Sequence, residues 1–136
     1  MPEFELAPSA ETETGRAVTL TQKDIRAIQL AKGALLAGIK LLCREAGIGR
    51  PTKIMVAGAF GNFINKNDAI TIGMFPDMPV THIEMKGNAA GAGAIYALFD
   101  PDFGHAANNV ARQTRVLDLA SLDAFQDTFV SSLYFP

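Results

Sequence analysis

The sequence predicts an α/β fold with a short parallel sheet packed by helices. Short apolar runs alternate along the chain with longer segments of helical periodicity, and parallel strands need such helical crossovers. Two of the apolar runs also break into glycine-rich turns that lead into helical segments. The chain has 136 residues, of which 49% are hydrophobic, so it can form one domain with a packed core.

The N-terminal segment differs in composition from the remainder of the chain. Residues 1–16 are polar, acidic and without periodicity, and we expect a flexible tail there. Residues 17–20 are compatible with a short edge strand. Residues 17–136 are therefore expected to form the folded part.

The clearest predicted element is a long helix. Thr21 is a good N-cap, Asp24 follows at the position of a capping box, and the helix should run to about Ala46 and end at Gly47. Apolar residues cover more than half of its circumference, so a sheet, another domain or a second subunit should cover it. Cys43, the one cysteine of the chain, is expected to be a buried thiol in this helix.

The remaining elements follow from periodicity and from capping residues. In chain order they are a buried strand at 53–56, a short helix at 65–72, a second strand at 80–85, a packed helix at 88–99, a helix near 105–113, a strand near 115–119 and a final helix from Ser121.

Two glycine-rich segments carry the prediction of a ligand site. The first is Ala57-Gly58-Ala59-Phe60-Gly61-Asn62 and the second runs from Gly87-Asn88 to Ala94. Glycine allows backbone amides to approach a ligand, and amides at a helix start favour phosphate. Neither segment has the spacing of a P-loop or of a dinucleotide fingerprint. For the segment at residues 57–62 we favour ligand contact, because the aromatic ring of Phe60 suits a base or ribose. The segment at residues 87–94 is equally consistent with close helix packing and with ligand contact.

Composition excludes several classes of partner. The net charge of −2, with acids and bases mixed along the chain, argues against nucleic acid as a partner. The chain has no apolar run long enough for a membrane span and no signal-peptide pattern, so we expect a cytoplasmic protein.

Candidate catalytic or metal-binding residues are not evident in the sequence. His82 and His105 have no second ligand at metal-site spacing, and Asp68, Asp77 and Glu84 are isolated carboxylates. Since no complete catalytic or metal set can be assembled, we predict no catalytic residue and no metal ligand in this chain.

Taken together, the motifs resemble those of a known family. They are Leu20-Thr21-Gln22-Lys23-Asp24-Ile25, Gln29-x-Ala31-Lys32-Gly33-Ala34, the two glycine-rich segments, Ile72-Gly73-x-x-Pro76, Phe125-Gln126-Asp127 and Phe135-Pro136. Over residues 17–136 the chain resembles the C-terminal part of the reductive activators of corrinoid proteins. These are iron–sulfur ATPases with an actin-like, sugar-kinase and Hsp70 type of nucleotide fold. The fold class implied is a partial ribonuclease H-like (actin-like ATPase) domain.

This resemblance implies a function and a set of site residues. Family members use ATP and electron transfer from an iron–sulfur cluster to return cob(II)amide to cob(I)amide on a corrinoid methyl-transfer protein. It implies ATP with Mg²⁺ as cofactor and a corrinoid protein as partner. The adenosine contacts match Gly58, Ala59, Phe60, Gly61 and Asn62, and Gly87 and Asn88 are implied to lie near the cleft or the interdomain hinge.

The chain departs from the full family pattern. It lacks the cysteine-rich cluster domain and the first half of the ATPase fold, so we expect a fragment of a larger protein that does not hydrolyse ATP alone. We also expect a homodimer or a larger assembly, because the long helix is so apolar. The alternatives are a non-catalytic dimerisation or docking module and a fragment of a sugar or acyl kinase.

Overall fold

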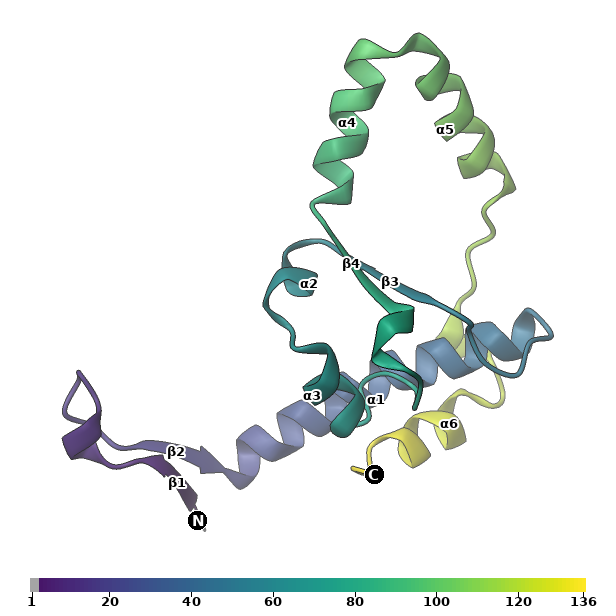
Figure 1. Ribbon diagram of the computed structural model, residues 1–136. Coiled ribbons are helices and arrows are strands. Elements are labelled where there is room, and N and C mark those ends of the chain that lie inside the picture. The colour runs from purple at the N-terminus through teal and green to yellow at the C-terminus, as the bar shows by residue number, and fades with distance from the viewer. Residues whose placement is uncertain (1–2) are drawn as a thin grey trace.

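The computed structural model describes residues 3–136, with the backbone alone described at residues 60 and 62. A long helix, α1, runs along the base of the molecule in Figure 1, with a β-hairpin at its start and a helical hairpin at the top of the view. In chain order the strands and helices are β1 (Glu3–Ala7), β2 (Val18–Thr21), α1 (Gln22–Glu45), β3 (Ile54–Ala57), α2 (Ala59–Phe63), α3 (Lys66–Thr71), β4 (Ile83–Gly87), α4 (Ala89–Phe99), α5 (Pro101–Gln113) and α6 (Phe125–Ser132). Among the described helices none is long and apolar enough to cross a membrane.

The N-terminal hairpin differs from the expected flexible tail. Strand β1 lies within residues 1–16 and pairs antiparallel with β2, with Phe4 opposite Leu20. Alternating Glu and apolar residues in β1 suit a strand with two unlike faces, and the pairing supplies partners for the backbone groups. Strand β2 corresponds to the predicted edge strand.

The long helix is confirmed. Thr21 and Asp24 form the capping box, with the Asp24 N–H donating to Thr21 Oγ1 at 3.2 Å and the Thr21 N–H donating to Asp24 Oδ2 at 2.9 Å. Gly47, with φ +69°, follows the end of the helix. Helix α1 packs on α6, and its residues Ala37, Leu41 and Cys43 are buried, whereas Leu30 and Leu42 remain about half exposed.

The central sheet is a parallel pair, β3 and β4. Ile54 lies opposite Ile83, and Met55 lies opposite Glu84. Ile83 joins Ala69, Phe75 and Met78 in the hydrophobic core, against which Ile54 and Val56 pack. The predicted second strand begins later than expected because residues 80–82, directly after Pro79, form one 3₁₀ turn.

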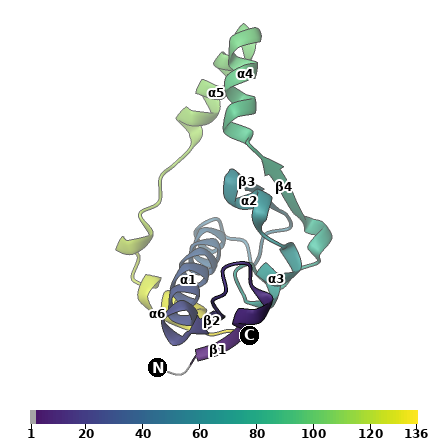
Figure 2. The same ribbon diagram turned by 90° about the vertical axis from the view of Figure 1, so that its left-hand side faces the viewer.

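Helices α4 and α5 form a hairpin that stands away from the other elements (Figures 1 and 2). Its described side chains meet at Tyr96 and Phe103, whose ring centroids are 5.6 Å apart. Helix α5 begins at Pro101, earlier than predicted, because Asp100 accepts hydrogen bonds from the N–H groups of Asp102 and Phe103. No residue of α4 is buried within the described structure.

The predicted strand near residues 115–119 was wrong. Residues 114–118 are extended but pair with none of the described strands, and Val116 is 95% exposed. A strand needs a neighbour to satisfy its backbone groups. The final helix begins at Phe125 rather than Ser121, because Asp118 instead caps a 3₁₀ turn at Leu119–Ser121.

Candidate functional site

The two glycine-rich turns meet at the carboxyl ends of β3 and β4. The Gly58 N–H donates to the Gly87 carbonyl oxygen at 2.7 Å, and Ala57 is the register partner of Gly87. Gly58 has φ +90° and Gly87 has φ +58°, which glycine adopts without the penalty of a Cβ. The carboxyl ends of parallel strands are where α/β folds bind ligands, so the structure brings the predicted site residues together there.

The first turn combines an open position with a tightly packed one. A Cβ on Gly58 would meet none of the described atoms within 4 Å, and Ala59 is exposed. A Cβ on Gly61 would lie 3.2 Å from the Val56 carbonyl oxygen, so a larger residue there would push α2 off the end of β3. Gly58 therefore leaves room for a ligand, and Gly61 allows α2 to fold back over the strand.

Phe60 and Asn62 belong to α2 by backbone. The ligand contacts predicted for their side chains lie outside what the structure describes.

The second turn is organised by its own cap. The Asn88 side chain accepts a hydrogen bond from the Gly91 N–H at 2.9 Å, and a Cβ on Gly91 would come within 2.4 Å of Asn88 Nδ2. A Cβ on Gly93 would meet nothing within 4 Å. Gly91 thus makes room for the cap of α4, and the described part of the chain supplies no element for close packing at Gly93.

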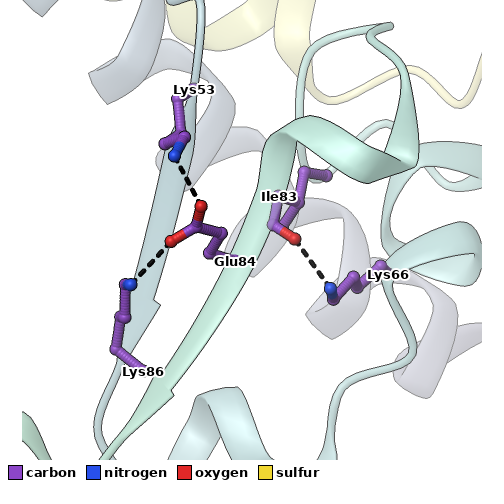
Figure 3. Close-up of polar contacts among 5 residues, drawn as sticks. All are labelled: Lys53, Lys66, Ile83, Glu84 and Lys86. Atoms are coloured by element: carbon purple, nitrogen blue, oxygen red, sulfur yellow. Dashed lines mark hydrogen bonds and ion pairs between the residues drawn. The ribbon is translucent and has the colours of Figure 1, made fainter.

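Three charged side chains line the solvent face of the β3–β4 pair. The Glu84 carboxylate lies between two ammonium groups, 2.5 Å from Lys53 Nζ and 2.6 Å from Lys86 Nζ (Figure 3). Hydrogen bonds from Lys53 and then Lys86 lower the pKa of Glu84 from 4.5 to about 2. The Lys53–Glu84 pair joins the two strands near their start, and Lys86, directly before Gly87, binds the same carboxylate.

Sequence reasoning missed this trio and named Glu84 only as an isolated carboxylate. The signal available was alternation, because Glu84 and Lys86 are two residues apart and so share one face of a strand. Lys66 was missed as well; its Nζ donates to the Ile83 carbonyl oxygen at 2.7 Å and joins α3 to the start of β4 (Figure 3).

Residues suited to metal binding do not gather in the structure. Across residues 3–136 no group of three His, Cys, Asp or Glu side chains is placed to hold a metal ion. His82 and His105 are exposed, on separate elements.

Comparison with known proteins decides the family. Residues 1–136, the whole chain, match the family described as the C-terminal domain of RACo, the ASKHA domain. The chain belongs to this family. Its actin-like α/β fold confirms the predicted fold class, and the resemblance to the corrinoid activators is confirmed as well.

Two relatives show how much of a longer protein this family domain represents. The corrinoid activation enzyme RamQ of Eubacterium limosum is 34% identical over 134 residues, covering 97% of this chain and 23% of RamQ. A solved structure, a reductive activator for corrinoid, iron–sulfur protein, is 31% identical with a TM-score of 0.83, covering 98% of this chain and 22% of that one. The chain thus spans less than a quarter of the length of these relatives.

Proposed function

We propose that this chain is the nucleotide-binding half of an ATP-dependent reductive activator. The longer protein would restore cob(I)amide on a corrinoid methyl-transfer protein, using electrons from an iron–sulfur domain. The observation that carries the proposal is the match of the entire chain to the RACo C-terminal family, together with a relative named for corrinoid activation.

The nucleotide site proposed in this chain is the pair of hydrogen-bonded glycine turns. No described atom lies within 4 Å of the Cβ position at Gly58, so we assign the adenosine contacts to Gly58, Ala59, Phe60, Gly61 and Asn62, with Gly87 and Asn88 beside them. Supporting this assignment, both turns lie at the carboxyl end of the parallel pair.

An iron–sulfur cluster does not fit the residues of this chain. A cluster is held by several cysteine thiolates, whereas Cys43 is the one cysteine and is buried in α1. We therefore assign the cluster to another part of the longer protein and the adenosine contacts to this one.

The test is an NMR titration of the chain with ATP and ADP, which detects even millimolar binding, equivalent to about −4 kcal/mol. We expect amide shifts confined to residues 58–62 and 87–88. Phe60→Ala should weaken the binding, and Phe63→Ala is the matched control because Phe63 is an 89% exposed aromatic in the same helix.

A second pair of variants separates ligand contact from backbone strain. Gly58→Ala and Gly15→Ala both place a Cβ at positive φ in open space, so both strain the backbone, but Gly58→Ala alone should reduce nucleotide binding. Absence of shifts at both turns at saturating nucleotide would overturn the assignment. Mg²⁺-dependent ATP hydrolysis above background would contradict the proposal that the chain is only half of the catalytic site.

Self-association is a second proposed property. Leu98 and Phe99 of α4 are 80% and 83% exposed, and exposed apolar patches of this kind mark interaction sites. We propose that the isolated chain forms a homodimer or larger assembly. Light scattering at micromolar concentration should give a mass above 14.5 kDa, and a monomer would refute this.

A further inference from the structure

Lys32 is a charged side chain in an unusual place. It is 0% exposed and lies on the side of α1 that faces the end of the chain. Its Nζ donates to the Tyr134 carbonyl oxygen and lies 5.0 Å from the centroid of the Phe135 ring. A buried ammonium group is costly unless such partners compensate, so its position depends on residues 134 and 135.

The turn after α3 meets the same ammonium group. Gly73 has φ +71°, and a Cβ there would lie 3.4 Å from Lys32 Nζ and 3.1 Å from Pro136 Cγ and Cδ. Lys32, Gly73 and Pro136 therefore converge although they are far apart in sequence. Each belongs to a motif of the family resemblance, and none of them lies in the glycine turns.

Because α6 packs closely on α1, the residues that follow α6 lie next to Lys32 and Gly73. A Cβ on Gly33 would lie 2.8 Å from Leu133 Cδ2 and 3.3 Å from the Ser132 carbonyl oxygen. Lys40 Nζ donates to Ser132 Oγ at 3.2 Å and holds the same region from further along α1. Residues 134–136 thus pass from α6 directly to Gly73.

On its other side, α3 packs against the start of β4, the strand that leads to the second glycine turn. Ala69 of α3 lies in the core with Ile83, the first residue of β4, and Lys66 Nζ binds the Ile83 carbonyl oxygen. The turn at Gly73 therefore lies between the end of the chain and the strand that leads to Gly87.

We propose that Lys32 is a positioning residue that latches residues 134–136 onto the Gly73 turn and so fixes α3 against β4. The Lys32 latch comprises Lys32, Gly73 and residues 134–136. It is a property of the fold of this chain; only its effect on nucleotide contacts at Gly87 rests on the proposed function.

Amide hydrogen exchange of the whole chain tests the latch without nucleotide. Lys32→Met keeps an apolar stem but removes the hydrogen bond and the cation–π contact, and it should accelerate exchange in residues 66–73 by about tenfold. The matched control is Lys23→Met, at an exposed position of the same helix, which should leave that exchange unchanged. A rate for Lys32→Met within about twofold of the unsubstituted chain would overturn the proposal.

A second pair of variants decides the matter if Lys32→Met fails to fold. Phe135→Leu removes the ring beneath the ammonium group, whereas Phe135→Tyr keeps it. The leucine variant should accelerate exchange in residues 66–73 and the tyrosine variant should not; equal rates in the two would refute the latch. If ATP shifts no amide in the unsubstituted chain, the proposed function fails while the exchange rates still decide on Lys32.

Discussion

The Glu84 carboxylate is held between Lys53 and Lys86 on the solvent face of the β3–β4 pair. Its depressed pKa means that folding favours the ionised form. The resulting stability is present above the ordinary pKa of 4.5 and is lost as the pH falls through the folded value of about 2. Acid should therefore loosen the contact between the strands that carry the two glycine turns.

Glu84→Gln tests this dependence on pH. The variant should unfold at a lower temperature than the unsubstituted chain near neutral pH, and the difference should shrink as the pH falls from 4.5 towards 2. Thermal unfolding followed by circular dichroism at several pH values measures it, with Glu13→Gln in the exposed N-terminal turn as control. A difference that does not vary with pH would contradict the ion-pair explanation.

The capping box gives a second prediction for a single residue. Thr21→Ala removes the Oγ1 acceptor of the Asp24 N–H and should lower the free energy of unfolding by about 1 kcal/mol. Thr21→Ser keeps the acceptor and serves as the control. Urea denaturation measures both, and equal losses would show that the methyl group of Thr21, rather than its hydroxyl, stabilises the helix start.

Substituting alanine for either of two glycines in α1 should change the stability of the chain in opposite directions. At Gly38 a Cβ would lie 3.5 Å from Leu119 Cδ1, an ordinary contact, so Gly38→Ala should stabilise the chain by up to about 1 kcal/mol through helix propensity. At Gly33 a Cβ would be overpacked against Leu133 and Ser132, and Gly33→Ala should destabilise by about 1 kcal/mol net. Urea denaturation of the two variants should give shifts of opposite sign.

The starts of α1 and α3 were predicted well from the sequence. The caps of α1 and α3 are local, since Thr21 and Asn65 accept hydrogen bonds from N–H groups within three residues. The strand expected near residues 115–119 failed because strand formation depends on a neighbour, which local sequence does not specify. The start of α5 at Pro101 is also marked locally, by the Asp100 cap and a proline at the first helical position, although periodicity alone predicted the helix only near residues 105–113.

The candidate site was predictable in position but not in detail. The apolar runs before Gly58 and Gly87 indicated parallel strands, whose carboxyl ends lie at one edge. The hydrogen bond between Gly58 and Gly87 depends on the register of those strands, and the placement of Lys53 beside Glu84 depends on the same register. The register is set by how Ile54 and Ile83 pack in the core, which spacing along the chain does not reveal.

At the scale of the whole molecule, the α4–α5 hairpin contains no buried residue among those the structure describes. Leu98→Lys places a charge at a position that is 80% exposed, so it should change stability by less than about 0.5 kcal/mol. If α4 forms the contact between copies, this variant should lower the mass measured by light scattering. Val116→Lys, at an isolated exposed apolar position outside the hairpin, should leave the mass unchanged.

The contact between α1 and α6 also has a consequence for the order of folding. Lys40 and Ser132 are 92 residues apart, and Lys32 and Tyr134 are 102 apart, so joining them closes a long loop at an entropic cost that nearby contacts do not carry. Contacts of such large sequence separation slow folding. Helix α1 can form early because its cap is local. The side of α1 that packs on α6 then stays exposed to water until α6 has packed against it.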